Sequence, residues 1–262
     1  MNKPLVRIKH VRTILNTAVS MIILVAVWQA VVRFGDYNES LLPSPLSVWN
    51  AVWKLIVDGT LWTHLQVSLL RFAAGYVSAS VAAIILGLIL GRIPVLWGFI
   101  DPLVQVIRPV SPIAWSPFIV LWFGIGNAPA IVIIFLAAFF PVLLSTVTAV
   151  RKMDMTYLKV AQNLEVSRYH LFSKIILPAI FPFIASGLHI AVGTSWIFLV
   201  SGEMVGAQSG LGYMIVDARN QLRLDFVLAG IIFIGLCGLL LDRLIGLLEN
   251  GINKQWGIVK DS

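Results

Sequence analysis

One stretch of the sequence decides the fold class. The segment from Pro109 to Val150 reads PVSPIAWSPFIVLWFGIGNAPAIVIIFLAAFFPVLLSTVTAV, 42 residues without an aspartate, glutamate, lysine or arginine. An α-helix rises about 1.5 Å per residue, so about 20 apolar residues cross a hydrocarbon core roughly 30 Å thick. The segment is long enough for two crossings, and Gly124-Ile125-Gly126-Asn127-Ala128-Pro129 interrupts it where a turn would fall. We therefore predict two membrane-spanning helices joined at this point.

Four further gaps without charged residues lie at 13–32, 72–91, 175–202 and 226–241. A charged side chain at mid-bilayer costs on the order of 3 kcal/mol, so such gaps locate membrane spans. The chain is 59% hydrophobic and only 12% charged, a composition typical of a membrane protein. We predict an all-α membrane protein with one transmembrane domain over residues 1–262 and about six transmembrane helices, at 13–34, 66–91, 98–124, 128–150, 179–204 and 225–248.

Small residues in the second predicted span favour close helix packing, chiefly Gly75, Gly87 and Gly91. Lysine and arginine are divided unevenly between the loops on the two sides of the membrane. With a cytoplasmic N-terminus, 13 of them fall inside and 5 outside, and Arg108 is unassigned. Cytoplasmic loops carry the excess of basic residues, so both termini are predicted to be cytoplasmic. The apolar run from Thr13 is too long for a signal peptide and lacks a small-residue cleavage site, so we expect it to remain as an anchor in the inner membrane.

Several classes of function are excluded by what the sequence lacks. The formal net charge is +7, but the basic residues are scattered singly and form no patch for nucleic acid. The four histidines are dispersed and form no H-E-x-x-H or similar cluster, so we expect no metal site. The single Cys237 cannot make an internal disulfide. No G-x4-G-K-[ST] phosphate loop occurs, so energy from ATP would have to come from another subunit. We predict no catalytic residue and no cofactor in this chain.

The largest predicted cytoplasmic loop, 151–178, carries the main functional signal. Lys159-Val160-Ala161-Gln162-Asn163-Leu164-Glu165 reads as a short helix with its apolar side chains on one side. Ser167 is expected to cap a second helix that ends toward Leu177-Pro178. A short amphipathic helix of this kind suits insertion into a groove on a soluble partner, and a plain interfacial loop is the alternative that periodicity leaves open.

The same loop resembles the EAA signature of binding-protein-dependent ABC importer permeases, E-A-A-x3-G-x9-I-x-L-P. Ala161, Ile175, Leu177 and Pro178 match it at the right spacing, whereas a lysine replaces the glutamate at 159 and a glutamate replaces the glycine at 165. Further segments are similar to the nitrate, sulfonate, taurine and bicarbonate branch of this family, in the same order: Leu42-Pro43-Ser44-Pro45, Asp101-Pro102-Leu103, Arg108-Pro109-Val110-Ser111-Pro112, Leu121-Trp122-Phe123-Gly124-Ile125-Gly126, Phe140-Pro141 and Gly210-Leu211-Gly212-Tyr213.

The resemblance implies a type I ABC importer transmembrane domain that forms the path for a small, anionic solute. The helix at 159–165 would be the coupling helix, received by a cytoplasmic ATPase that binds ATP and magnesium. The implied partners are two ATPase subunits, a second permease copy and an extracytoplasmic substrate-binding protein. A homodimer is the simpler expectation, and a related second permease is the alternative.

Ionisable and helix-breaking residues inside the spans are the candidates for a solute path. His189 lies well inside the fifth predicted span, where a cation would meet an anion; the alternative is a neutral ring bonded to a backbone carbonyl. The third span contains Pro112 between two further prolines, which predicts a broken helix and a pore wall carrying Trp115 and Trp122. Arg108 joins this candidate path, with pairing to Asp101 or to a lipid phosphate as the alternative.

Other charged and interfacial segments have more ordinary interpretations. Glu203 is predicted to pair with Arg219 or Arg223. Two segments lie outside the spans, one that begins with Pro43-Ser44-Pro45 and one at 209–224. Each would either dock a partner or rest on the membrane surface. In the first segment, Ser44 is expected to cap a helix that starts at Pro45.

Two other classes of membrane protein are rival interpretations. A secondary transporter or channel independent of an ATPase would show an internal repeat or paired intramembrane carboxylates, and the sequence shows neither. A membrane-embedded enzyme would show a cluster of catalytic or metal-binding residues, which is likewise missing from the sequence.

Overall fold

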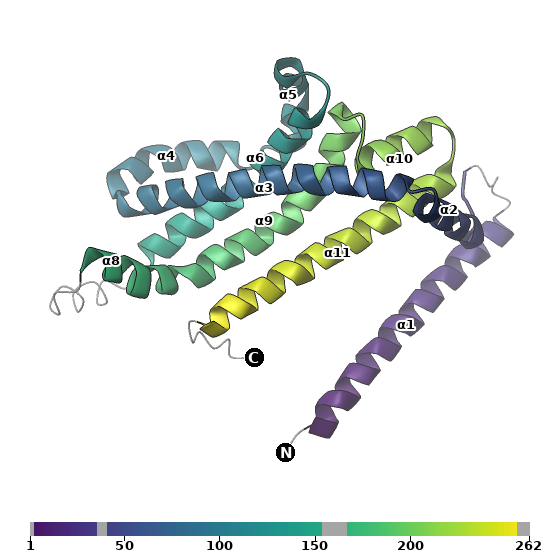
Figure 1. Ribbon diagram of the computed structural model, residues 1–262, viewed down its shortest axis with the longest axis horizontal. Coiled ribbons are helices and arrows are strands. Elements are labelled where there is room, and N and C mark those ends of the chain that lie inside the picture. The colour runs from purple at the N-terminus through teal and green to yellow at the C-terminus, as the bar shows by residue number, and fades with distance from the viewer. Residues whose placement is uncertain (1–2, 36–40, 154–166, 256–262) are drawn as a thin grey trace. The chain divides into compact units, whose positions relative to one another are not determined.

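The computed structural model describes residues 3–35, 41–153 and 167–255. It comprises two compact units, one made of Met1–Leu61 and Ile215–Ile232 and the other of Trp62–Met214 and Phe233–Ser262. Over the described residues the chain is helical and contains no strand, which confirms the predicted all-α class (Figure 1). In chain order the elements are α1 (Lys3–Phe34), α2 (Pro45–Val57), α3 (Thr60–Arg92), α4 (Pro94–Ile107), the 3-10 helix η1 (Pro112–Trp115), α5 (Ser116–Phe123), α6 (Asn127–Arg151), α8 (Arg168–His170), the π-helical turn η2 (Leu171–Ile176), α9 (Leu177–Gly206), α10 (Leu211–Asn220) and α11 (Leu224–Gln255).

Five helical segments of the described chain are long and apolar enough to cross a membrane. They are Leu15–Phe34, Thr60–Arg92, Asn127–Arg151, Ser173–Gly206 and Leu224–Glu249. The segments Pro94–Ile107 and Pro112–Phe123 make a sixth crossing if they count as one span, and they are bent by 85° relative to each other. The break falls at 108–111, beside two prolines that lack the backbone N–H a continuous helix needs.

The second unit is organised around α6, which packs along α9 on one side and close to α3 on another. Gly75, Gly87 and Gly91 of α3 approach α6 so closely that a Cβ on each would lie 2.7, 2.6 and 2.7 Å from Ile134, Thr146 and Val150. The predicted close packing through small residues is therefore confirmed. α4 folds back alongside α3, and its Trp97 and Val104 complete the core (Figure 1). The other buried residues of this cluster are Ala79, Ala83, Leu90, Ala138, Val142, Leu143, Val147 and Ala191.

The segment before α9 differs in one respect from the sequence prediction. The Ser167 hydroxyl accepts a hydrogen bond from the backbone N–H of His170 at 3.5 Å, as expected of a cap. The predicted helix end toward Leu177-Pro178 is wrong, because the helical run continues through η2 into α9 as far as Gly206. Pro178 is tolerated because it falls in the first turn of α9, directly after the change in hydrogen-bond pattern at the π-helical turn.

The first unit contains α1, α2 and the segment around the start of α11. The Ser44 hydroxyl accepts a hydrogen bond from the backbone N–H of Ser47 at 3.2 Å, and Pro45 is the first residue of α2. Both features of the predicted helix start are therefore confirmed. Arg223 pairs with Asp225 at 3.1 Å and lies over the ring of Phe226, with its guanidinium carbon 3.7 Å from the ring centroid.

Candidate functional site

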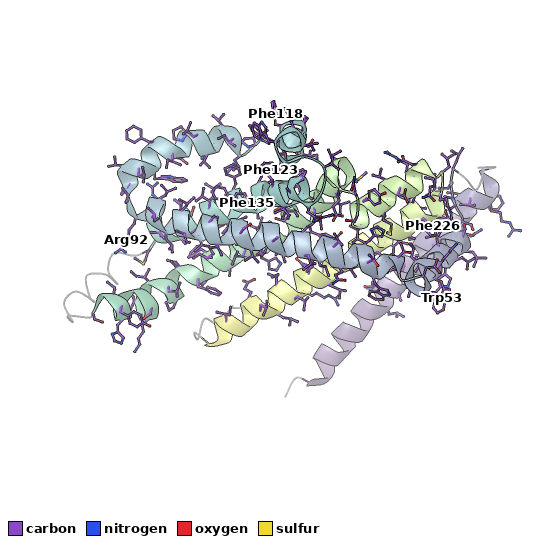
Figure 2. The ribbon with its side chains drawn as sticks, turned by 45° about the horizontal axis from the view of Figure 1, so that its top comes forward. Trp53, Arg92, Phe118, Phe123, Phe135 and Phe226 are labelled. Atoms are coloured by element: carbon purple, nitrogen blue, oxygen red, sulfur yellow. The ribbon has the colours of Figure 1, made fainter. Side chains whose placement is uncertain are left out.

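A pocket of about 830 Å³ opens in the second unit beside the break between α4 and η1. The end of α4, η1 and α5 form one wall, and α6 and α9 form the others. Aliphatic and aromatic side chains make up most of the lining, and Figure 2 shows two of the aromatic ones, Phe123 and Phe135. The lining residues are Ile107, Arg108, Val110, Pro112, Trp115, Ile119, Trp122, Phe123, Val132, Phe135, Leu136, Ala137, Phe139, Phe140, Pro141, Leu144, Ser145, Ile190, Thr194 and Phe198.

Four of the five candidate path residues come together in this pocket. Arg108, Pro112, Trp115 and Trp122 all line it, although they belong to three consecutive pieces of backbone. The break explains this convergence, because an 85° turn brings the end of α4 and the aromatic side chains of η1 and α5 around one space. Trp115 and Trp122 are 37% and 69% exposed, so their rings are available to an occupant.

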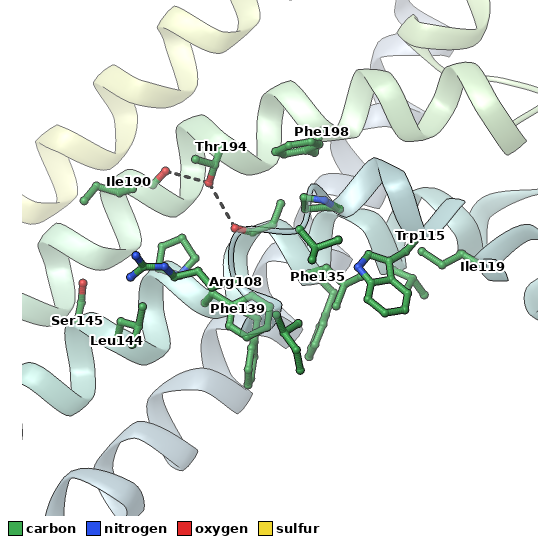
Figure 3. Close-up of a pocket in the computed structure, with 18 of the residues that line it drawn as sticks. Arg108, Trp115, Ile119, Phe135, Phe139, Leu144, Ser145, Ile190, Thr194 and Phe198 are labelled. Carbon is green, nitrogen blue, oxygen red and sulfur yellow. Dashed lines mark hydrogen bonds between the residues drawn. The ribbon is translucent and has the colours of Figure 1, made fainter. Parts of the chain in front are cut away.

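The pocket has a polar side and an aromatic side. In Figure 3 the guanidinium of Arg108 points toward the side where Ser145 lies, whereas Trp115 and Ile119 lie at the opposite side. No described carboxylate lies within ion-pair distance of Arg108, so the alternative of pairing with Asp101 is not realised. The Thr194 hydroxyl is held by the backbone, since it donates toward the carbonyls of Ile190 at 3.1 Å and Ala137 at 3.4 Å.

His189 is placed differently from the other four candidates. It does not line the pocket, and its ring lies between two carboxylates of α11. Its Nε2 is 3.0 Å from Oδ1 of Asp242, and its Nδ1 is 3.2 Å from Oε2 of Glu249. Both ring nitrogens thus face side chains, and the alternative of a ring bonded to a backbone carbonyl is not realised. Two neighbouring carboxylates also repel an anion, so this position does not suit the predicted contact between His189 and an anionic solute.

Glu203 has a partner that sequence reasoning missed. The prediction that it pairs with Arg219 or Arg223 is wrong: its Oε1 lies 2.8 Å from Nη1 of Arg71, and the two side chains are 0% and 3% exposed. The Ser68 hydroxyl and the backbone N–H of Gly212 also donate to the carboxylate, at 2.7 and 2.9 Å. A buried carboxylate needs such donors, because water no longer solvates its charge.

Arg71 is fully satisfied in this arrangement. Its Nε and Nη2 donate to Oδ1 of Asn127 at 2.9 and 2.6 Å, and its Nη1 and Nη2 donate to the carbonyl and hydroxyl of Ser209 at 2.6 and 2.8 Å. With the bond to Glu203, all five N–H donors of the guanidinium have acceptors. We call Ser68, Arg71, Asn127, Glu203, Ser209 and Gly212 the Arg71–Glu203 network. It ties α3, the start of α6 and the end of α9 to the 207–210 turn.

The Arg71–Glu203 network explains why positions 210 and 212 are glycines. Gly210 has φ of +101°, and a Cβ there would overlap the carboxylate of Glu203. A Cβ on Gly212 would overlap the carbonyl oxygen of Val200. The two glycines therefore let the backbone approach the buried carboxylate, and the N–H of Gly212 donates to it. One signal in the sequence indicates the pairing of Arg71 with Glu203. Arg71 directly precedes the charge-free gap 72–91, Glu203 directly follows the gap 175–202, and the two side chains carry opposite charges.

The predicted coupling segment, 159–165, lies outside the described residues. Lys159, Val160, Ala161, Gln162, Asn163, Leu164 and Glu165 all belong to the 154–166 range, which the structure does not describe. Their assignment therefore stays a prediction. The described flank runs from Ser167 through α8 and η2 directly into α9, which supplies part of the pocket wall.

Comparison with known proteins places these features in a family. The family model described as binding-protein-dependent transport system inner membrane component matches residues 81–254. A Bacillus subtilis permease protein named for aliphatic sulfonates transport is 35% identical over 88% of this chain and 84% of its own. The nitrate import permease protein of Leptolyngbya laminosa is 34% identical over 93% and 89%, and the taurine transport system permease protein of Escherichia coli is 34% identical over 92% and 90%. The chain belongs to the family of binding-protein-dependent transport system inner membrane components, and it is a multi-pass inner-membrane permease of the ABC importer type.

Proposed function

We propose that this permease forms the translocation path for a small anion of the sulfonate, taurine, nitrate or bicarbonate class. The observation that carries the proposal is the charge in the pocket: among the described lining residues Arg108 alone is ionisable, and arginine stays protonated at any physiological pH. The names of the similar permeases, which refer to aliphatic sulfonates, nitrate and taurine, support the same class. The family consists of transport permeases, so the chemistry is binding and passage of a solute.

The proposed path consists of Arg108, Pro112, Trp115 and Trp122 together with the walls from α6 and α9. Prolines at the break free backbone carbonyls that would otherwise be bonded within a helix, and a water-filled or solute-filled space can receive them. We leave His189 out of the path, because its ring is engaged by Asp242 and Glu249 on α11.

The proposal includes the partners that such a permease needs. Two ATPase subunits, which hold ATP and magnesium, would receive the segment 159–165 of each permease copy. A second copy of this chain would complete the path, and an extracytoplasmic binding protein would deliver the solute. Both termini and the 151–178 loop would lie in the cytoplasm, in agreement with the 13 to 5 distribution of basic residues.

The coupling role is tested by Leu164→Arg, with Leu164→Met as the matched control. The arginine places a charge on the apolar side of the predicted coupling helix, whereas methionine preserves its apolar character and approximate volume. In proteoliposomes that contain the permease, its ATPase and its binding protein, Leu164→Arg should abolish ATP-driven uptake while the chain remains in the membrane. Unaltered uptake in Leu164→Arg would refute the coupling assignment, and uptake without any ATPase would favour a secondary transporter or channel.

A further inference from the structure

We propose that α2 is a membrane-surface helix, which rests one face on lipid at the membrane boundary where the α1 span ends. The sequence leaves two roles open for this segment, docking a partner or resting on the membrane, and the arrangement of side chains on α2 favours lipid. The inference concerns neither the solute nor the coupling segment, so it goes beyond the proposed function and does not depend on it.

α2 has two apolar faces on opposite sides of the helix. Val48, Ala51 and Leu55 are 2–3% exposed and form the face that is buried in the protein. The opposite face, which we call the outer face of α2, is 62–67% exposed and consists of Leu46, Trp49, Trp53 and Val57. Their spacing of three and four residues places them on one side of a helix with 3.6 residues per turn. A surface helix of a water-soluble protein has one apolar face, so the outer face requires a second apolar environment.

The polar residues of α2 form a narrow stripe along one flank. Ser47, Asn50 and Lys54 are also three and four residues apart, and Asn50 and Lys54 are exposed. On the other flank, the outer face continues into the half-buried side chains of Val52 and Ile56. A docking surface for a soluble protein has a polar rim around an apolar centre, and this face has polar residues on one flank only. A helix at a bilayer surface contacts protein, lipid and water along three different sides, as the residues of α2 require.

The residue types on the outer face favour the boundary of the bilayer over its interior. Tryptophan is enriched at membrane–water interfaces, because its large ring is apolar and its indole N–H can bond to water or headgroups. Trp49 and Trp53 lie one turn apart and are both exposed. The adjacent Lys54 can lay its aliphatic stem along the apolar surface while its ammonium group reaches water or a lipid phosphate.

The chain on both sides keeps α2 at the end of a membrane span. Within the first unit, α2 lies against the end of α1 that is away from the N-terminus, where the span Leu15–Phe34 ends (Figure 1). After α2, only Asp58 and Gly59 precede α3, the next helix that is long and apolar enough to cross the membrane. A connection of this length spans at most about 10 Å, so α2 cannot move far from the membrane into water.

The experiment measures which side chains of α2 contact lipid. Cys237→Ala removes the single cysteine of the sequence, and a cysteine for a nitroxide label is then introduced by Trp53→Cys, by Val57→Cys or, as the matched control in the polar stripe, by Asn50→Cys. The full-length chain is assembled with its ATPase in phosphatidylcholine nanodiscs. Paramagnetic relaxation is measured with oxygen, which concentrates in lipid, and with a nickel chelate, which stays in water. Oxygen should dominate at 53 and 57, and the nickel chelate should dominate at 50.

A second measurement keeps the native indole rings. In nanodiscs of brominated phosphatidylcholine, lipid bromine quenches the fluorescence of tryptophans that contact lipid. Trp49→Phe combined with Trp53→Phe should remove a strongly quenched part of the wild-type emission. Trp97→Phe is the control, because Trp97 is 7% exposed in the core of the second unit and should remove an unquenched part. This measurement tests the proposal even if a labelled variant fails to assemble.

Three outcomes would overturn the inference. Free access of the nickel chelate to positions 53 and 57, lost when the binding protein is added, would identify the outer face of α2 as a docking surface for that protein. Labels that neither reagent reaches, with spectra broadened by a neighbouring label, would identify a second copy of the chain as the occupant. Emission from Trp49 and Trp53 that brominated lipid leaves unquenched would exclude contact with the bilayer.

Discussion

Replacing Arg71 with leucine should strongly destabilise the second unit, because it breaks a buried ion pair. The substitution removes five hydrogen bonds, to Glu203, Asn127 and Ser209, and leaves the carboxylate of Glu203 buried without its cation. Breaking a buried ion pair by removing one partner costs about 3–5 kcal/mol. Spread over a unit of this size, that loss corresponds to a fall in melting temperature of roughly 6–20 °C.

The assay is thermal unfolding of the purified chain in a mild detergent, followed by the loss of monodisperse protein on size-exclusion chromatography. Arg219→Leu is the matched control, because Arg219 is an exposed arginine whose replacement should cost within about 0.5 kcal/mol. The double variant Arg71→Leu with Glu203→Leu should recover part of the loss, since a buried pair replaced by apolar residues leaves no unpaired charge. Recovery should be incomplete, because Asn127, Ser209 and the N–H of Gly212 lose their partners.

Two results would refute this reasoning. A melting temperature of Arg71→Leu within about 2 °C of the wild type would show that the pair contributes little. A double variant whose loss equals the sum of the two single variants would show that Arg71 and Glu203 do not interact energetically.

Three further predictions concern other contacts. Gly212→Ala should lower the melting temperature by several degrees, because the new Cβ would overlap the carbonyl of Val200. Gly193→Ala is the control and should be neutral or slightly stabilising, because the space around its new Cβ is open. Equal effects of the two substitutions would contradict the close approach of Gly212 to Val200. Ser44→Ala should cost about 1 kcal/mol at the start of α2 and speed amide exchange at 45–48, and no change in exchange would show that the cap is dispensable. His189→Leu removes the ring that separates Asp242 from Glu249 and should speed amide exchange at 242–249, but it should leave ATP-driven uptake unchanged; loss of uptake would return His189 to the solute path.

The membrane class, the helices and the family could be predicted from the sequence because they depend on local properties. Hydrocarbon excludes charge at every point of a span, so gaps in the charge pattern locate the spans without knowledge of packing. The close approach at Gly75, Gly87 and Gly91 was predictable for a similar reason, because a residue without a side chain permits contact whichever helix meets it. The break beside Pro109 and Pro112 follows from their missing N–H groups.

The partners of the charged residues were decided by tertiary structure alone. Glu203 pairs with Arg71, which lies 132 residues earlier, and not with the arginines that follow it closely in sequence. The rotation of α9 about its axis selects this partner, and it likewise turns the ring of His189 toward α11 and the side chain of Thr194 into the pocket. Sequence spacing states which residues share a helix face, but which helix that face meets depends on packing over the whole unit.

For the pocket, too, the sequence identified the candidate residues and the tertiary structure decided how they are arranged. Arg108 and Pro112 were identifiable because a cation is costly inside an apolar span and because a proline interrupts the hydrogen bonding of a helix. That Arg108 lies at one side and Trp115 at the other follows from an 85° bend and from the walls that α6 and α9 supply. The sequence by itself determined that the chain enters the membrane and where, because solvation acts on each residue separately. Only the tertiary structure decided which side chains share a space, because that depends on the angles at which distant helices pack.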